Sequence, residues 1–203
     1  MPNPAVKLTN IGGAHLCASL ASSAPLLAAY LLRKALTVAN DDDIIFVRYR
    51  YLDASAAVKL VIAEPASSEI LAYFESGDPF YMTAPCTTEV LSVLKVKYFY
   101  RKELSADQYT KAAYCFLSYL NDRIKIRGPS IDNSHVFWEA DELARRHNLD
   151  LIDALQLVTI KQGSFVGPGA PLLITADDAL ARAARVEQIE AWNCATEPRP
   201  AHA

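Results

Sequence analysis

The chain has 203 residues, of which 52% are hydrophobic and 21% are charged, and its formal net charge at pH 7 is −3. This composition excludes general disorder and leaves room for one well-packed domain with an appendage. The weak negative charge argues against a protein that coats polyanions, although a cluster of functional carboxylates would itself lower the charge of an enzyme that acts on nucleic acid.

The N-terminal segment, residues 1–47, is the hardest part of the sequence to interpret. It has no charged side chain between Ile11 and Leu32, a pattern also found in membrane spans and signal peptides. Glycine, serine, histidine and Pro25 dilute its hydrophobicity, so we expect no membrane-spanning helix and regard a signal peptide as the less favoured alternative. We expect a weakly structured extension, or an incorrectly assigned start if translation begins at Val47.

The cysteines are scattered along the chain, at Cys17, Cys86, Cys115 and Cys194. They form no C-x-x-C pair, and no histidine stands at the spacing of a zinc ligand. We therefore expect free thiols in a reducing cytoplasm rather than disulfides or a zinc site.

From residue 48 onward, strand-like and helix-like segments alternate. Strands are expected at Arg48–Asp53, Phe80–Ala84, Leu172–Thr175 and Gln188–Trp192. Helices are expected at Ala56–Ala63, Ser67–Glu75, from Thr87 or Thr88 through Leu94, and at Ser105–Ile124, Ser134–Ala144, Asp150–Lys161 and Asp177–Ala184. This alternation predicts an α/β fold with a mostly parallel sheet that is covered on both faces.

Two local sequence patterns predict where helices begin. Ser105 followed by Gln108 is a capping-box pattern, which predicts a helix beginning just after Ser105. Pro85 is expected to break the second strand, so that Thr87 or Thr88 caps the next helix. Glu89 would then lie in the first turn of that helix.

Four acidic residues occupy positions where a metal site can be assembled. Asp53 and Asp177 follow two buried strands, and the carboxyl ends of parallel strands meet at one edge of a sheet. Glu89 comes from a helix, and Asp153 stands within the apolar stretch Leu151–Leu155. Carboxylate oxygens are preferred by Mg²⁺ and Mn²⁺, and a buried carboxylate is costly without a cation or a proton.

Each of these acids also has an ordinary structural explanation. Asp177 is a good helix cap, Glu89 is favoured near a helix start by the helix dipole, and Asp153 can pair with a lysine. Taken together and in this order, the four favour the metal site.

The pattern resembles the PIN-domain ribonucleases, in particular the VapC-like toxins of bacterial toxin–antitoxin pairs. The matching segments are Tyr51–Ser55, Thr88-Glu89, Ile152–Leu157, Leu173–Leu180, Ala183-Ala184 and Ala191–Asn193. This resemblance implies a three-layer α/β/α PIN-like domain over residues 48–193, between the extension 1–47 and a disordered tail at 194–203. The long extension departs from the family, whose members usually begin a few residues before the first Asp.

The resemblance also implies a site and a function. Asp53, Glu89 and Asp153 would be catalytic ligands of Mg²⁺ or Mn²⁺, and Asp177 a fourth acid that holds the metal through water. Ser55 and Thr175 would be supporting hydroxyl groups. The implied activity is a cytoplasmic endoribonuclease that hydrolyses RNA with metal-activated water. The implied partners are a cognate antitoxin and a second copy of the chain, with no membrane.

Two other interpretations stay open. The first is a PIN-like protein that binds RNA or a partner without cleaving it. The stretch Thr175–Asp178 also resembles magnesium-dependent phosphatases of the haloacid dehalogenase type, but these need an acid two residues after the nucleophile, where this chain has Ser55. Basic residues that can contact an RNA backbone, although each is more often a solvated helix residue, are Lys95, Lys97, Arg101, Lys102, Lys125, Arg127, Arg145 and Arg146.

Overall fold

The structure is a computed structural model that describes residues 49–76, 79–129, 133–163 and 171–200. The expected N-terminal extension, residues 1–47, lies outside the described residues. No helix in the described ranges is both long and apolar enough to cross a membrane.

Five parallel strands form the sheet of the described domain. They are β1 (Arg50–Leu52), β2 (Phe80–Met82), β3 (Ile124–Ile126), β4 (Leu172–Thr175) and β5 (Glu190–Asn193). Their order across the sheet is β3-β2-β1-β4-β5, and every neighbouring pair is parallel. Arg50 is in register with Phe80 of β2 and with Leu172 of β4, so β1 is the central strand. The expected mostly parallel sheet is confirmed.

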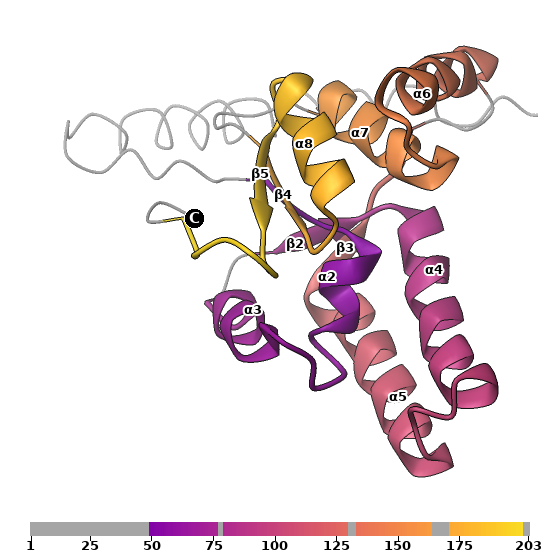
Figure 1. Ribbon diagram of the computed structural model, residues 1–203, viewed down its shortest axis with the longest axis vertical. Helices are drawn as coiled ribbons and strands as arrows, with labels where there is room; N and C mark the ends of the chain where they lie inside the picture. Colours follow the sequence, from indigo (N-terminus) through magenta and orange to yellow (C-terminus); the bar gives the residue numbers. More distant parts are fainter. Residues whose placement is uncertain (1–48, 77–78, 130–132, 164–170, 201–203) are drawn as a thin grey trace, which may run out of the picture. The chain divides into compact units, whose positions relative to one another are not determined.

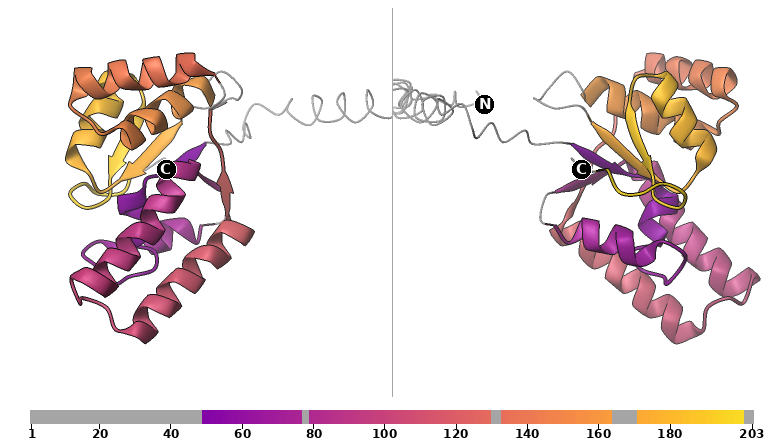
Figure 2. Two further views of the ribbon diagram at one scale, coloured as in Figure 1. Left: turned by 90° about the vertical axis from the view of Figure 1, so that its right-hand side faces the viewer. Right: turned by 60° about the vertical axis from the view of Figure 1, so that its left-hand side comes forward.

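Helices cover both faces of this sheet. They are α2 (Ala54–Val58), α3 (Ser67–Phe74), α4 (Ala84–Lys95), α5 (Ala106–Asp122), α6 (Ser134–His147), α7 (Leu151–Gly163) and α8 (Asp178–Val186), and a π-helical turn, η1 (Val96–Tyr100), continues α4. In Figure 1, helices α2 to α5 lie below the sheet and α6 to α8 lie above it, and the side view in Figure 2 shows the same division.

The two hydrophobic cores follow from the alternation of side chains along each strand. Leu52 of β1 and Ile174 of β4 belong to the core that includes residues of α2 to α5. Their neighbours Tyr51 and Leu173 belong to the core that includes residues of α6 to α8. Because both faces are buried near the centre of the sheet, β2 and the first three residues of β4 have continuous apolar sequences. The three-layer α/β/α arrangement is confirmed.

Helix α4 begins earlier than the sequence suggests. Its cap is Thr83, whose hydroxyl accepts a hydrogen bond from the Cys86 N–H at 3.2 Å. The expectation that Pro85 ends the preceding segment and that Thr87 or Thr88 caps the helix is therefore wrong. A proline in the first helical turn has no N–H that needs a partner, and its fixed φ suits a helix start. Glu89 consequently lies in the second turn rather than the first.

Strand β3 is absent from the sequence expectations, which continue the preceding helix to Ile124. Helix α5 has the expected capping box between Ser105 and Gln108, but it ends at Asp122. Strand β3 follows at the edge of the sheet, where Ile124 is buried and Lys125 and Ile126 are exposed. A three-residue edge strand has too short an apolar pattern to be recognised from sequence.

The folded domain extends beyond residue 193. Cys194 is buried, and its N–H donates a hydrogen bond to the Thr175 carbonyl at 2.8 Å. Glu197 forms an ion pair with Arg185 of α8 at 2.6 Å. These contacts pack the segment from Cys194 to Glu197 against the end of the sheet, within the range 194–203 where a tail is expected from the sequence.

A carboxylate after α8 links the three helices on one face of the sheet. Glu187 accepts hydrogen bonds from Lys161 at 2.7 Å, from His147 at 2.8 Å and from Arg146 at 3.0 Å. Burial alone would raise the pKa of Glu187, but the hydrogen bonds and charges of these partners outweigh it and lower the pKa to about 2. The ionised form is therefore the one that stabilises the fold.

Acid should remove this stabilisation. The folded pKa is lower than the ordinary value of about 4.3, so the contribution is complete above pH 4.3 and is lost as the pH falls toward 2. Glu187→Gln should lower the free energy of unfolding at pH 7 by about 2 kcal/mol and flatten its decline in this range. Urea titrations at several pH values test this, with Glu142→Gln, which removes an exposed partner of Arg146, as the control. If the free energy of unfolding of Glu187→Gln falls with pH in parallel with that of the wild type, Glu187 is not the group whose protonation destabilises the fold.

Candidate functional site

Asp53 lies directly after β1 at the carboxyl edge of the sheet and caps α2. It is buried, with 3% of the residue exposed. Its Oδ2 accepts hydrogen bonds from the Ser55 N–H at 3.1 Å, from the Ser55 hydroxyl, and from the Thr175 hydroxyl at 3.0 Å. Burial raises the pKa of Asp53, and these hydrogen bonds offset part of the increase. The carboxylate is thus oriented but poorly solvated.

Ser55 and Thr175 join two strand ends that are far apart in sequence. The Ser55 hydroxyl accepts a hydrogen bond from the Ala176 N–H at 2.8 Å, and Thr175 Oγ1 accepts one from the Asp177 N–H at 2.9 Å. The network therefore connects the start of α2 to the start of α8. Both hydroxyl groups donate to the Asp53 carboxylate, and Thr175 Oγ1 also accepts from the backbone N–H of Asp177.

Glu89 and Asp153 approach this edge from α4 and α7. Burial is the main cause of a raised pKa at Glu89, and the charges of Asp53 and Asp150 raise it further. Burial and four neighbouring carboxylates raise the pKa of Asp153 to about 8. Those neighbours are Asp53, Asp150, Asp177 and Glu89, in decreasing order of effect. Asp153 therefore experiences the charge of every other member of the predicted quartet.

Asp150 is an acid of this region for which the sequence predicts only a helix start. Its carboxylate accepts a hydrogen bond from the Asp153 N–H at 2.9 Å, so it caps α7. It also raises the pKa of both Glu89 and Asp153. The three-residue spacing of Asp150 and Asp153 across a helix start was the available signal, since it places both side chains near one end of the helix.

A buried glutamine holds the acid-bearing segments together. Gln156, one turn after Asp153 in α7, is fully buried. Its amide nitrogen donates to the Leu52 carbonyl at 3.3 Å, next to Asp53, and its amide oxygen accepts from the Cys86 thiol of α4 at 3.4 Å. One side chain thus links β1, α4 and α7. Its polarity within an apolar helix is explained by these two contacts.

Asp177 has a structural role in addition to its position near the other acids. Its Oδ1 accepts hydrogen bonds from the Ala179 N–H at 2.6 Å and from the Leu180 N–H at 3.0 Å, which caps α8. The ordinary explanation for this residue is therefore correct as far as the fold is concerned. A substitution that tests its charge has to preserve the cap.

Asparagine and alanine should separate the two roles of Asp177. Asp177→Asn keeps an oxygen at the cap and should change the free energy of unfolding by only a few tenths of a kcal/mol, whereas Asp177→Ala should lower it by about 1 kcal/mol. Thermal melting of the two variants measures this difference. An equal decrease in the free energy of unfolding of Asp177→Asn and Asp177→Ala would mean that the charge of Asp177, rather than its capping hydrogen bonds, stabilises α8.

The acids suit a hard cation in donor type and in charge. All their donor atoms are carboxylate oxygens, and the charged neighbours that shift the pKa of Asp153 are all carboxylates. Within the described ranges, however, no three histidine, cysteine, aspartate or glutamate side chains are gathered closely enough to hold an ion as they stand. Direct coordination of Mg²⁺ or Mn²⁺ by three of these acids would require the carboxylates to draw together, which a divalent charge favours by offsetting their repulsion.

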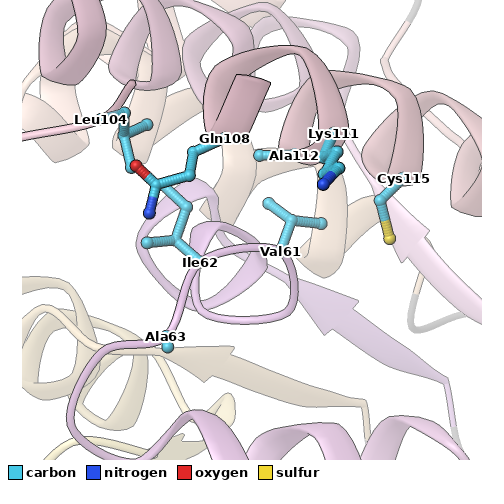
Figure 3. A pocket seen from close by; sticks show the side chains of 8 residues that line it. All are labelled: Val61, Ile62, Ala63, Leu104, Gln108, Lys111, Ala112 and Cys115. Atoms are coloured by element: carbon cyan, nitrogen blue, oxygen red, sulfur yellow. The ribbon is translucent and has the colours of Figure 1, made fainter. Parts of the chain in front are cut away.

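A cavity of about 280 Å³ lies elsewhere on the domain, between the segment after α2 and helix α5 (Figure 3). Apolar side chains such as Val61, Ile62 and Leu104 line it, together with Lys111 and Cys115. None of the four predicted acids contributes to its lining. This cavity is therefore not part of the acidic site.

Several solved structures share this fold. FitAB bound to the IR36 DNA fragment aligns with a TM-score of 0.51 at 15% identity, covering 74% of this chain and 98% of that chain. FitAcB from Neisseria gonorrhoeae gives a TM-score of 0.48 at 15% identity, covering 73% of this chain and 99% of that chain. VapC20 from Mycobacterium tuberculosis, a sarcin-ricin loop cleaving toxin, gives 0.47 at 15% identity, covering 66% of this chain and 94% of that chain. At these identities the likeness concerns the fold alone.

The sequence itself matches a family description. No curated protein matches the chain. The PIN domain family model matches residues 50–186, which span β1 to the end of α8 and include all four predicted acids. Because this match covers more than half of the sequence, the chain belongs to the PIN domain family.

Proposed function

We propose that this protein is a metal-dependent endoribonuclease. The observation that carries the proposal is that acids from three other segments of a PIN domain, together with the cap residue Asp150 of its own helix, act electrostatically on Asp153 at the carboxyl edge of a parallel sheet. Asp53, Glu89 and Asp153 would hold Mg²⁺ or Mn²⁺, and Asp177 would act as the fourth acid through water. Like-charged carboxylates in a partly buried site are stable only when a cation or protons compensate them.

A bound divalent ion would supply activation of water and compensation of negative charge on the phosphodiester. Residues of the chain hold the acids in place for this chemistry. Ser55 and Thr175 fix the Asp53 carboxylate by donating to Oδ2. Gln156 fixes the relative positions of β1, α4 and α7, and the burial of Asp53 strengthens electrostatic interactions at the site. No side-chain nucleophile is required.

Removal and replacement of metal test the enzymatic assignment. Purified full-length protein should cleave a single-stranded RNA in Mg²⁺ or Mn²⁺, lose that activity in excess EDTA, and regain it when the metal is restored. Asp178→Asn is a suitable control, because Asp178 is exposed and adjoins Asp177. Its carboxylate accepts a hydrogen bond from Asn193, and an asparagine oxygen can preserve that bond. Cleavage that persists in EDTA would overturn the proposal. A wild-type chain that binds RNA but never cleaves it would favour the non-catalytic alternative.

We further propose that the enzyme acts in the cytoplasm as the homodimeric toxin of a toxin–antitoxin pair. Support comes from the order of the sequence motifs and from the presence of FitAB and a VapC20 toxin among the proteins of similar fold. Induced expression in a bacterial host should arrest growth, Asp53→Asn should not, and co-expression of the product of the neighbouring upstream gene should relieve the arrest. Harmless strong induction of the wild type would remove the toxin role while leaving a nuclease of another kind.

A further inference from the structure

A pocket of about 240 Å³ adjoins the acidic site and is lined by two lysines and two glutamates. Its lining includes Ser55 and Glu89, together with Lys59, Glu64 and Lys97. Glu89 and Lys97 are eight residues apart along α4 and η1, with Val93 between them in the same wall. This spacing corresponds to about 12 Å along a helix axis. The pocket therefore leads from the acids toward the two lysines.

The two lysines converge on a single carboxylate. Lys97 Nζ lies 2.7 Å from Glu64 Oε1, and Lys59 Nζ lies 3.2 Å from Glu64 Oε2. The three side chains are mostly covered, with exposed fractions of 16% for Lys97, 10% for Lys59 and 23% for Glu64. Lys97 has a second partner, Glu103, at 2.9 Å. Poorly solvated ammonium groups need an anion nearby, and here Glu64 provides it.

Glu64 can leave this position without unfolding of the segment that carries it. It lies in the connection between α2 and α3, and its backbone is fixed by Ser67: the Glu64 N–H donates to Ser67 Oγ at 2.9 Å, and the Ser67 N–H donates to the Glu64 carbonyl at 3.0 Å. Rotation of the side chain alone would expose both ammonium groups to the pocket. A phosphate is an anion of the kind that lysine binds as a point charge.

We propose that Lys59 and Lys97 bind a phosphate that flanks the scissile one in a single-stranded RNA, and that Glu64 occupies this subsite until RNA displaces it. The inference rests on the proposed function, because it takes the acids as the place where the strand is cut. An RNA strand carries one phosphate per nucleotide, so a strand held at Glu89 continues past the lysines with its backbone charges. The two lysines therefore recognise the charge of the RNA backbone and not the identity of the bases.

Two kinds of substitution should act in opposite directions. Lys59→Met and Lys97→Met keep a long apolar side chain and remove one positive charge each. Each should weaken RNA binding about threefold to tenfold and reduce the slope of log K against log salt by about 0.7. Glu64→Gln removes the competing anion and should strengthen binding by a similar factor. A purely structural ion cluster predicts instead that Glu64→Gln leaves affinity unchanged or lowers it.

Fluorescence anisotropy of two labelled single-stranded RNAs of different sequence tests this, with the full-length protein in EDTA at several salt concentrations. Because anisotropy measures binding without relying on cleavage, this result is separate from failure of the nuclease assignment. Lys111→Met is the control, since Lys111 pairs with Asp107 on the exposed surface of α5 and should leave affinity and salt slope unchanged. The subsite is supported if each lysine variant loses affinity for both RNAs by the same factor and Glu64→Gln gains affinity.

Several outcomes would overturn the proposal. Unchanged salt slopes in Lys59→Met and Lys97→Met exclude a phosphate contact, and a wild-type chain that binds neither RNA excludes the subsite altogether. If a lysine variant is unfolded at the assay temperature, the test rests on Glu64→Gln. RNA binding by Glu64→Gln that is weaker than, or equal to, that of the wild type contradicts displacement of Glu64 by RNA. In Mn²⁺, a soluble Lys59→Met should raise KM and leave kcat unchanged.

Discussion

Asp153→Asn should reduce RNA cleavage by more than about a hundredfold while the domain stays folded. Asp153 is the residue on which the charges of Asp53, Asp150, Asp177 and Glu89 all act, so it lies at the electrostatic centre of the site. An amide keeps the size of the side chain but offers a divalent cation only a neutral oxygen, and the loss of one ligand removes most of the metal-dependent rate enhancement. The measurement is the initial rate of cleavage in saturating Mn²⁺.

Asp53→Asn should give a loss of the same order, and its fold can be checked independently. Asparagine is as good a helix cap as aspartate, and its oxygen can still accept hydrogen bonds from Ser55 and Thr175. Full activity in either variant, with normal melting behaviour, would remove that residue from the site. Loss of activity together with loss of cooperative melting would indicate misfolding rather than a missing ligand.

Divalent metal should stabilise the wild type and fail to stabilise Asp153→Asn. A ligand present at a hundred times its Kd adds about 2.7 kcal/mol to the free energy of unfolding when it binds only the folded state. In EDTA the order should reverse, with Asp153→Asn at least as stable as the wild type, because the substitution removes a group whose charged form is disfavoured by burial and by four neighbouring carboxylates. Thermal melting with and without Mn²⁺ measures both effects.

The control for this experiment is Asp178→Asn, which should respond to Mn²⁺ as the wild type does. Equal stabilisation of wild type and Asp153→Asn would place the bound ion elsewhere. A marked loss of stability of Asp153→Asn in EDTA would show that the carboxylate has a structural partner outweighing the repulsion, and the electrostatic account of the site would be wrong.

The layered fold and the edge that carries the site follow from simple sequence patterns. Continuous apolar segments ending at Asp53 and just before Asp177 identify β1 and β4, and the parallel arrangement places their ends at the same edge. The capping box at Ser105 correctly identifies the start of α5. These features are local or periodic, so they are visible without tertiary contacts.

Other features depend on contacts that a single sequence does not encode locally. Pro85 is compatible both with the end of a strand and with the first turn of a helix, and packing of α4 against the sheet decides between them. Asp150 has the signature of an ordinary helix cap, and its electrostatic effect on Glu89 arises only from the fold. The pairing of Lys59 and Lys97 through Glu64 likewise joins residues from different segments.

The chemical form of the RNA product ends distinguishes attack by water from attack by the ribose 2′-hydroxyl. We assign the attack on phosphorus to water at the proposed site of Asp53, Glu89, Asp153 and Asp177, rather than to the ribose 2′-hydroxyl. Cleavage of a defined RNA in Mn²⁺ should therefore give 5′-phosphate and 3′-hydroxyl ends, and a single 2′-deoxy substitution at the scissile nucleotide should slow the reaction without stopping it. Products with 2′,3′-cyclic phosphate ends would contradict the account.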